Sequence, residues 1–391
     1  MSRCFDLDIT EKVELIERPP TEEVVTREEL VELFKTNSSP KHYIGLEISG
    51  FLHLGSLIST GFKINDFLKA GVNCTIFLAD WHTMINDKLG GDWDTITKVS
   101  KYYADAFKLV CPQANIVLGS DLYDSRKEYW KEFMEFSKHM SIKRTMRTLT
   151  IMGRSEDESK IDLAKLLYPP MQAVDIHSLD LDIVHSGMDQ RKIHMLVREI
   201  FPKMKWKVPV AVHHGLLPGL RNSEEKYPEE KKADVKVECL ECGYVFGPQE
   251  SQGQCPKCGH KGTHTTINIG KMSKSDPNSG VFIHNSDDEI KKKISKAWCE
   301  EANTKINPLL EIARTIIFHE FNEMNVERPE KFGGNISYTN YNKLETDFAK
   351  KKLHPTDLKQ TVGSYLVKII SPIREKLNLS EELQDIIKKS Y

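Results

Sequence analysis

The sequence has no long apolar run and almost no net charge. No stretch approaches the roughly 20 consecutive apolar residues that a membrane-spanning helix needs, which argues against a membrane protein. The first 20 residues are acidic and interrupted by prolines, unlike a secretory signal peptide. Because the formal net charge is only −2, no overall field draws the chain onto nucleic acid, so any such contact needs a local patch. We therefore expect a cytoplasmic protein.

Cysteine is scarce outside one cluster, and internal repeats are missing. Four of the eight cysteines are scattered and are predicted to be small buried hydrophobic residues. The other four form two C-x₂-C pairs separated by 12 residues, each followed by glycine: Cys239, Cys242, Cys255 and Cys258. This spacing predicts a structural zinc ribbon, whose four ligands leave no open position for catalysis. A cytosolic setting argues against disulfides as the alternative.

Strand and helix patterns alternate over the first 220 residues, which predicts an α/β fold with a Rossmann-like, doubly wound parallel sheet. A helix is predicted at 21–36, and one long helical region at 127–152. Ligands of such sheets bind at the carboxyl ends of the strands. The predicted domains are an N-terminal helix plus Rossmann-like domain at 1–222, a linker and zinc ribbon at 223–265, a cationic loop region at 266–283, and an all-α domain at 284–391.

The stretch "SGFLHLGS", residues 49–56, lies at a predicted strand-to-helix junction. Gly50 and Gly55 allow a ligand to approach the backbone, and the helix start offers unpaired N–H groups. His53 adds a hydrogen-bond donor that titrates near neutral pH. A phosphate-handling loop is one interpretation, and a glycine-bearing turn with an incidental histidine is the other.

The stretch "GKMSKSDPNSG", residues 270–280, predicts a mobile cationic loop. Lys271 and Lys274 would neutralise a leaving pyrophosphate, and Ser273 and Ser275 would donate hydrogen bonds. Taken alone, such a loop is most often only solvent-exposed.

Together, in this order, the two stretches resemble the HxGH-type and KMSKS signatures of class I aminoacyl-tRNA synthetases. The KMSKS match is complete, whereas the first signature departs at Ser56, where the family usually has histidine. The resemblance implies use of ATP with Mg²⁺. The residues implied for ATP are Gly50, His53, Gly55, Ser56, Met272 and Lys274, and those implied for catalysis are His53, Lys271, Lys274 and Ser275.

Tyr168, Gln172 and Asp175 are spaced at i, i+4 and i+7, so one helical face carries all three. A polar wall with one carboxylate suits a ligand with an ammonium group at one end and a hydroxyl at the other. These segments, with "YIGLE" and "LADWH", are similar to tyrosyl-tRNA synthetases of the archaeal and eukaryotic type. The resemblance implies that Tyr43 and Asp175 bind the phenolic hydroxyl of L-tyrosine. It also implies an ammonium site formed by Tyr168, Gln172 and Gln190, with Glu47 nearby.

The same resemblance extends to the C-terminal region through "KFGG" and "LHPTDLK". It implies that Phe332 and His354 stack on an anticodon base of tRNA(Tyr) and that Asp357 accepts from its edge, as in other readers of single-stranded bases. Arg191 and the basic segment 137–147 are candidates for acceptor-stem contacts. A homodimer is implied by the family alone, and we expect neither a membrane nor a DNA partner.

Other functions remain open from the sequence. A tryptophanyl-tRNA synthetase shares both signatures, although an indole has no hydroxyl for Tyr43 and Asp175 to bind. A nucleotidylyltransferase that does not act on tRNA would need only the first signature. A zinc-ribbon nucleic-acid-binding protein that has lost catalysis is the third alternative, with Ser56 in its favour. The zinc ribbon itself would either brace the KMSKS loop or contact tRNA.

Overall fold

The computed structural model describes residues 7–152, 161–221, 278–305 and 307–389, with short stretches at 235–239, 245–246, 254, 258–259, 264–268 and 272. The chain divides into two compact units. Unit 1 consists of Met1–Leu216, Phe282–His284 and Ile369–Tyr391, and unit 2 of Leu217–Val281 and Asn285–Lys368.

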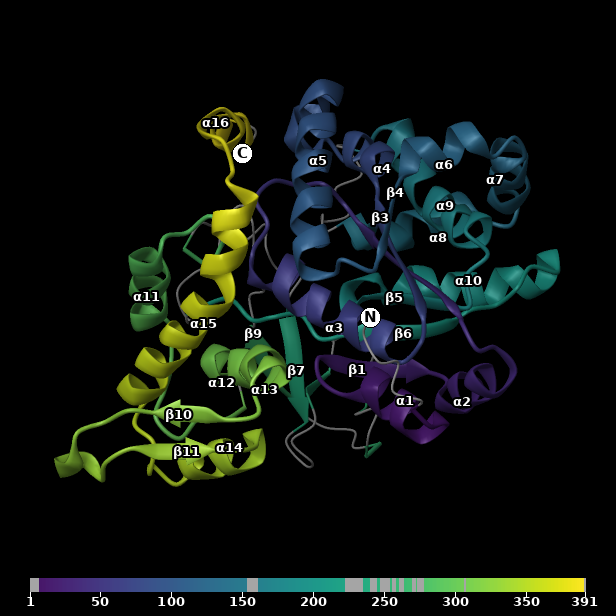
Figure 1. Ribbon diagram of the computed structural model, residues 1–391. Helices are drawn as coiled ribbons and strands as arrows, with labels where there is room; N and C mark the ends of the chain where they lie inside the picture. The colour runs from purple at the N-terminus through teal and green to yellow at the C-terminus, as the bar shows by residue number, and fades with distance from the viewer. Residues whose placement is uncertain are drawn as a thin grey trace. The chain divides into compact units, whose positions relative to one another are not determined.

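Unit 1 is built on a six-stranded sheet in the order β1-β6-β5-β2-β3-β4 (Figure 1). The strands are β1 (Thr21–Val25), β2 (Lys41–Leu46), β3 (Asn73–Leu78), β4 (Asn115–Leu118), β5 (Ile183–Gly187) and β6 (Val210–His214). Strands β2 to β6 pair in parallel, and β1 is an antiparallel edge strand on β6. The predicted α/β sheet is confirmed, with this one antiparallel strand added. The chain runs outward from β2 to β4 and returns to β5 beside β2, so the topological switch point lies between β2 and β5.

The helix predicted at 21–36 is wrong over its first five residues. Residues 21–25 form β1, and only Arg27–Thr36 form helix α2. Val24 and Val25 are β-branched and suit an extended strand, which β6 stabilises by backbone pairing. Helical periodicity does not report such a tertiary partner. Thr26 marks the boundary, because its hydroxyl accepts from Glu29 N and caps α2.

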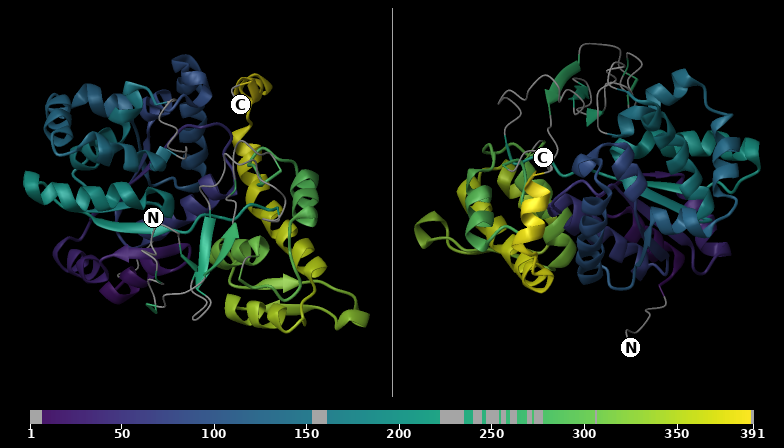
Figure 2. Two further views of the ribbon diagram at one scale, coloured as in Figure 1. Left: turned by 180° about the vertical axis from the view of Figure 1, so that it is seen from behind. Right: turned by 90° about the horizontal axis from the view of Figure 1, so that it is seen from above.

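Helices cover both faces of this sheet (Figures 1 and 2). Adjacent residues of β2 face opposite ways. The His42 ring lies 4.3 Å from that of Phe67, and Tyr43 belongs to the opposite core with Met171 and Ile193. The helices of unit 1 are α1 (Ile9–Glu17), α2, α3 (Thr60–Lys69), α4 (Asp80–Ile85), α5 (Trp93–Val110), α6 (Gly119–Ser125), α7 (Tyr129–Ser137), α8 (Ile142–Thr148), α9 (Leu163–Ser178), α10 (Arg191–Met204) and α16 (Glu381–Lys389). No helix within the described ranges combines the length and apolarity that crossing a membrane requires.

The helical region predicted at 127–152 is interrupted between α7 and α8. Ser141 causes the restart, because its hydroxyl accepts from Arg144 N and caps α8. The two helices therefore change direction, and both pack on α9.

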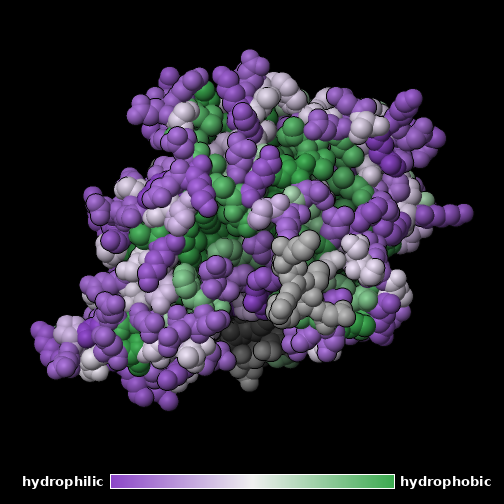
Figure 3. All heavy atoms as spheres, in the orientation of Figure 1, coloured by the Kyte–Doolittle hydropathy of each residue, from purple (hydrophilic) through white to green (hydrophobic). Residues whose placement is uncertain are grey.

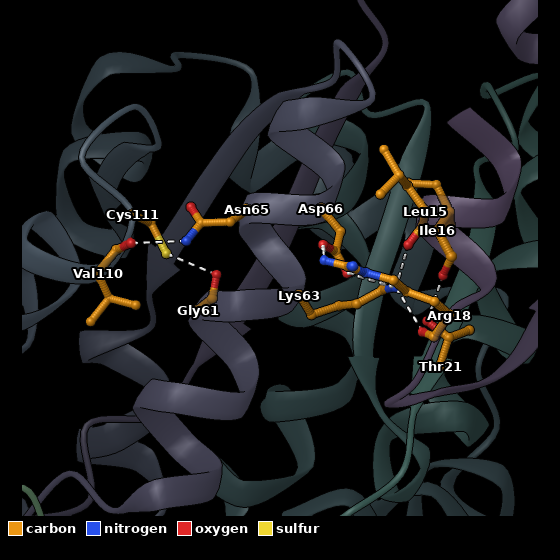
Figure 4. Close-up of polar contacts among 10 residues, drawn as sticks. All are labelled: Leu15, Ile16, Arg18, Thr21, Gly61, Lys63, Asn65, Asp66, Val110 and Cys111. Carbon is orange, nitrogen blue, oxygen red and sulfur yellow. Dashed lines mark hydrogen bonds and ion pairs between the residues drawn. The ribbon is translucent and has the colours of Figure 1, made fainter. Parts of the chain in front are cut away.

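Helix α3 is fixed to the N-terminal segment by a buried lysine (Figure 4). Lys63 is fully buried, and its Nζ donates to the carbonyls of Leu15 at 2.8 Å and Arg18 at 3.0 Å. Asp66, also fully buried, accepts from Lys63 at 3.4 Å and from the Arg18 guanidinium. These contacts satisfy carbonyl groups at the end of α1 that the helix cannot pair itself.

The opposite side of α3 is fixed to the end of α5 (Figure 4). Asn65 Nδ2 donates to the Val110 carbonyl at 3.0 Å, and Cys111 Sγ lies 3.2 Å from the Gly61 carbonyl. A Cβ at position 61 would approach Val110 Cγ1 to 2.5 Å, so this position requires glycine. Since α3 directly follows the "HLGS" turn, both attachments restrain that turn.

Unit 2 contains helices and two small sheets. The helices are α11 (Asp287–Lys296), α12 (Pro308–Ile312), α13 (Phe318–Glu320), α14 (Tyr341–Ala349) and α15 (Pro355–Leu377), whose end lies in unit 1. Strands β10 (Met324–Val326) and β11 (Ile336–Tyr338) pair antiparallel, so the prediction of an all-α domain at 284–391 is wrong in this hairpin. Its strands are only three residues long, too short to show an alternating pattern. A second sheet, β8-β7-β9, contains Val245–Phe246, Val235–Cys239 and His264–Asn268.

Candidate active site

Most of the polar residues predicted to bind the amino acid come together at the switch point of unit 1. Helix α9 contributes Tyr168, Gln172 and Asp175, as predicted, and β2 contributes Tyr43. Gln190 ends a 3₁₀ turn (Met188–Gln190) that directly follows β5. The structure thus places these side chains where an open α/β sheet binds its ligand.

Asp175 is the buried carboxyl of this site, with only 1% of its surface exposed. Its Oδ1 accepts from the Tyr129 hydroxyl at 2.7 Å, and its Oδ2 accepts from the Tyr123 hydroxyl at 3.3 Å. Burial raises the pKa of Asp175 to about 8, against the lowering effect of the two tyrosine hydrogen bonds. Each hydroxyl that donates to this group lowers its pKa, so a third phenolic hydroxyl would favour the carboxylate form.

Two further buried rings stand beside Asp175. His82 Nε2 lies 3.7 Å from Asp175 Oδ2, and the ring meets that of Tyr168 edge-on at 4.5 Å. Burial lowers the pKa of His82 to about 4, so the imidazole is neutral near pH 7. Burial and the charge of Asp175 both raise the pKa of Tyr43, which is 2% exposed. Its hydroxyl therefore stays protonated and can act as a donor.

The two glutamines form the other end of the site. Gln190 Nε2 donates to the Ile151 carbonyl at 2.8 Å, and Gln172 Nε2 lies 3.4 Å from Gln190 Oε1. Gln172 Oε1 is buried and makes no hydrogen bond within the described part of the chain. A buried amide oxygen without a donor is costly, which marks it as a position for a ligand N–H group.

Glu47 follows β2 and is 20% exposed. Its Oε1 accepts from Asn86 Nδ2 at 2.6 Å, and its Oε2 lies 3.9 Å from Lys88 Nζ. Asn86 also donates to the Met152 carbonyl at 3.2 Å. Glu47 is therefore held near the site by α4 and the turn that follows it.

The "HLGS" segment forms a capped turn rather than an ordinary helix start. The chain adopts π-helical geometry over Leu54–Ser59, and Gly50, just before the segment, has a positive φ of 109°. His53 Nδ1 accepts from the N–H groups of Gly55 at 3.1 Å and Ser56 at 3.3 Å. Because Nδ1 accepts, a neutral ring carries its proton on Nε2 and can donate from that side.

Ser56 caps the start of this turn together with His53. Its hydroxyl accepts from His53 N at 2.9 Å, which makes the contact between the two residues reciprocal. This arrangement is a capping box, in which each residue satisfies a backbone N–H of the other. A serine at the fourth position of the motif thus orients His53.

Two adjacent tyrosines of α5 hold the glycine loop in front of this turn. The Tyr103 hydroxyl donates to the Gly50 carbonyl at 3.0 Å and accepts from Ser49 N at 3.3 Å. The Tyr102 hydroxyl accepts from Leu52 N at 3.2 Å. Sequence analysis missed both residues, because helical spacing does not distinguish them from core aromatic residues.

The segment that follows the second signature also contacts the first. Ile283 N donates to the Leu52 carbonyl at 3.0 Å, and Phe282 pairs with His53 across an antiparallel bridge. Met272 is buried, and its N donates to the Leu217 carbonyl. The predicted residues Lys271, Ser273, Lys274 and Ser275 lie outside the described residues.

Arg191 is engaged within unit 1. Its guanidinium binds both oxygens of Glu23 from β1, at 2.8 and 2.9 Å. Burial raises the pKa of Glu23, but hydrogen bonds from His213 and Arg191 outweigh this effect and lower the pKa to about 2. The predicted acceptor-stem contact would therefore compete with a strong internal ion pair.

The three predicted anticodon-binding residues lie in unit 2. Phe332 is 62% exposed and precedes Gly333, whose φ is 97°. His354 is exposed, and its Nδ1 accepts from Thr356 N at 3.2 Å at the start of α15. Asp357 is half-buried in the first turn of the same helix.

Arg328 connects the two segments that carry these residues. Its Nε donates to the Gly334 carbonyl at 2.6 Å, and its Nη1 donates to the Lys352 carbonyl at 2.8 Å. The segments that carry Phe332 and His354 are therefore held together by hydrogen bonds from one guanidinium group.

The predicted zinc ligands are mostly outside the described residues. Of Cys239 only the backbone is described, at the end of β7, and Cys242 and Cys255 are not described. Cys258 is exposed, and the Gly259 that follows it has a positive φ of 73°. Among the described residues alone, no group of three His, Cys, Asp or Glu side chains could hold a metal ion.

Comparison with known proteins gives a consistent family assignment. Residues 35–226 and 263–371 match the family of tRNA synthetases class I (W and Y). A tyrosine–tRNA ligase of Thermococcus sibiricus is 41% identical over 400 residues, covering 98% of each chain. That of Thermococcus kodakarensis is 41% identical and covers 98% of this chain and 99% of its own.

Solved structures give the same result. The crystal structure of the tyrosyl-tRNA synthetase of Pyrococcus horikoshii, complexed with L-tyrosine, matches with a TM-score of 0.82. It is 38% identical, and the match covers 98% of this chain and 100% of that one. The similarity therefore extends over both units rather than over the sheet alone.

Proposed function

The chain belongs to the tyrosine–tRNA ligases, which are class I aminoacyl-tRNA synthetases, and from this premise we propose which of its residues carry out the reaction. The enzyme activates L-tyrosine with ATP to give tyrosyl-adenylate and pyrophosphate, and transfers the tyrosyl group to the 3′-terminal adenosine of tRNA(Tyr). Tryptophan ligation and the two alternatives outside the synthetases are set aside, because the full-length relatives are tyrosine ligases.

The buried Asp175 carries the assignment of the amino-acid site. In this proposal the phenolic hydroxyl of L-tyrosine donates to Asp175 and accepts from the protonated Tyr43 hydroxyl. Phenylalanine would form neither of these hydrogen bonds, and a site built to bind the hydroxyl strongly rejects the analogue that lacks it, for which a tyrosyl-tRNA synthetase is the documented example. Support comes from the bonds that Asp175 already accepts from Tyr129 and Tyr123.

The ammonium group of the substrate would bind at the opposite end. Gln172 Oε1, which has no donor within the described residues, would accept from it, and Gln190 and Tyr168 would complete the site. Glu47 would contribute a negative charge nearby. The carboxylate of the substrate would then face the nucleotide loop.

The chemical step would depend on positioning and charge rather than on a covalent nucleophile. The tyrosine carboxylate attacks the α-phosphate of ATP, the bond to the β-phosphate oxygen breaks, and pyrophosphate leaves. His53 would donate from Nε2 to the developing charge, while Gly50, Gly55 and Ser56 leave room for the nucleotide. Lys271, Lys274 and Ser275 would bind the leaving pyrophosphate, with Met272 lining the nucleotide site. Mg²⁺ would accompany the phosphates of ATP.

A structural zinc site is proposed for the cysteine cluster. Cys239 ends β7, which pairs antiparallel with β8, a strand that begins at Val245. The left-handed backbone of Gly259 suits the tight turn after a thiolate pair. Zinc would stabilise this fold without taking part in catalysis. Metal analysis of the purified chain should find one zinc per chain, and Cys239→Ser with Cys242→Ser should remove it.

The tRNA and dimer contacts are also proposals. Phe332 and His354 would stack on an anticodon base, Asp357 would accept from its edge, and Arg191 would contact the acceptor stem after leaving Glu23. Exposed apolar side chains on three neighbouring helices support a homodimer: Trp130 and Met134 on α7, Ile142 on α8, and Leu163 and Leu167 on α9. Figure 3 shows apolar side chains at the surface of unit 1 on the drawn face. Because tRNA charging feeds translation, we also propose a cytoplasmic location.

ATP–pyrophosphate exchange with each amino acid in turn tests these assignments. Exchange with tyrosine should be far faster than exchange with any other amino acid, and charging should be restricted to tRNA(Tyr). Exchange at comparable rates with phenylalanine would contradict the proposed roles of Asp175 and Tyr43.

A further inference from the structure

The two oxygens of Asp175 have unequal surroundings. Oδ1 accepts a short hydrogen bond of 2.7 Å from Tyr129. Among the described residues, Oδ2 has two looser contacts, the Tyr123 hydroxyl at 3.3 Å and His82 Nε2 at 3.7 Å. A carboxylate offers about four lone-pair positions, so Oδ2 retains capacity for another donor.

We propose that Tyr129 is a positioning residue for tyrosine recognition: it fixes Asp175 through Oδ1 and thereby presents Oδ2 to the hydroxyl of the substrate. The inference rests on the proposed role of Asp175 and adds the residue that orients it. Tyr129 does not itself contact the substrate in this arrangement. Tyr123 and His82 flank the receiving oxygen.

The surroundings of Tyr129 explain why its hydroxyl stays in place. It is the first residue of α7 and is fully buried, and its ring lies 4.4 Å from that of Tyr123 and 5.2 Å from that of Trp130. Its hydroxyl also lies 3.4 Å from the Met171 carbonyl of α9. Moving it away from Asp175 would require α7 to shift against α9.

The turn before α7 is itself braced. Arg126 donates to both carboxylate oxygens of Glu132, at 3.0 and 2.7 Å, and Glu132 lies 3.5 Å from His177 of α9. These contacts connect the α6–α7 turn to the helix that carries Asp175. The anchor and the carboxyl group are thus held by the same pair of helices.

This geometry affects how the site distinguishes tyrosine from phenylalanine. A carboxyl group fixed at one oxygen cannot rotate to optimise a bond with a misplaced ligand, so the hydroxyl of tyrosine meets a prearranged acceptor. Phenylalanine makes no such bond, and its weak activation does not depend on the orientation of Asp175. Loss of the anchor should therefore reduce activation of tyrosine and leave that of phenylalanine unchanged.

Tyr129→Phe removes the anchoring hydroxyl and keeps the ring. ATP–pyrophosphate exchange should show kcat/KM for tyrosine reduced roughly 10-fold to 100-fold, in the range for a hydrogen bond to a charged group. The KM for ATP and kcat/KM for phenylalanine should not change. Tyr123→Phe is the matched control, because it removes the looser hydrogen bond to the other oxygen, and its effect should be smaller.

Several outcomes would overturn the inference. Parallel losses for tyrosine, phenylalanine and ATP would mean that Tyr129 has a general structural role, and thermal melting of each variant would reveal such a defect. A larger effect of Tyr123→Phe would identify the wrong anchor. Asp175→Asn separates this failure from failure of the proposed site. If Asp175→Asn abolishes the preference for tyrosine over phenylalanine and Tyr129→Phe leaves it intact, only the positioning role of Tyr129 is wrong. If the preference survives Asp175→Asn, the proposed tyrosine site at Asp175 is itself wrong.

Discussion

Replacing His42 by leucine should make the protein more resistant to acid. His42 lies on β2 with no exposed surface, packed against Phe67 and with its ring centre 5.3 Å from that of His185. Neither of its ring nitrogens makes a hydrogen bond of normal geometry to the described residues. Burial lowers the pKa of His42 to about 3. The folded protein therefore holds this ring neutral at any pH near neutrality.

The sign and size of the effect follow from this shift. An unfolded histidine has a pKa of about 6.5, so below pH 6.5 the unfolded state takes up a proton that the folded state refuses. Stability from His42 is thus fully present above pH 6.5 and is lost as the pH falls. Between pH 7.5 and 5.5 the wild type loses about 1.4 kcal/mol of unfolding free energy at this one site. Other titrating groups cancel when the variant is compared with the wild type.

Urea unfolding at both pH values measures this difference. The free energy of unfolding of His42→Leu minus that of the wild type should rise by about 1.4 kcal/mol on going from pH 7.5 to 5.5. Any repacking cost of the substitution is the same at both pH values and drops out. His139→Leu, at an exposed position, is the control substitution. A difference that does not vary with pH would refute the claim that His42 is buried in its neutral form.

Three further predictions concern contacts described above. Ser56→Ala should slow adenylate formation less than His53→Ala, because it removes the cap but not the donor, and equal losses in exchange assays would contradict this division. Lys63→Ala should lower the free energy of unfolding, measured in urea, by about 3–5 kcal/mol, because it leaves Asp66 buried without this partner. The double variant Lys63→Met with Asp66→Leu should regain most of the lost free energy. A Lys63→Ala variant as stable as the wild type would show that the ion pair is not buried. Arg328→Ala should reduce kcat/KM for tRNA in aminoacylation about tenfold without changing ATP–pyrophosphate exchange, and equal losses in both assays would contradict a role limited to tRNA.

Much of the fold could be predicted from sequence because its strands are continuous apolar runs between polar turns. The alternation over the first 220 residues indicated the parallel sheet, and Gly71, with a φ of 85°, follows the end of α3. The strand at 21–25 was missed, because its pairing with β6 depends on residues almost 190 positions later. The β10–β11 hairpin was missed because its strands are too short for a pattern.

The site was predicted only in part, because some of its residues come from elements that lie far apart in the sequence. Tyr168, Gln172 and Asp175 share one helix, so their spacing was sufficient to group them. Tyr129 and Tyr123 come from other elements and resemble ordinary core aromatic residues in the sequence. His82 had a signal, since it ends "LADWH" just after a buried strand, but its neighbour Asp175 is 93 residues away. Only the folded chain shows that these groups surround one carboxyl.

A crystal structure of this chain with L-tyrosine would show whether the substrate is bound through its hydroxyl. The phenolic oxygen should lie within hydrogen-bond distance of Asp175 Oδ2 and the Tyr43 hydroxyl. The ammonium nitrogen should contact Gln172 Oε1, and Tyr129 should keep its bond to Oδ1. A phenolic oxygen bound elsewhere, with Asp175 contacting only its own tyrosines, would contradict the account.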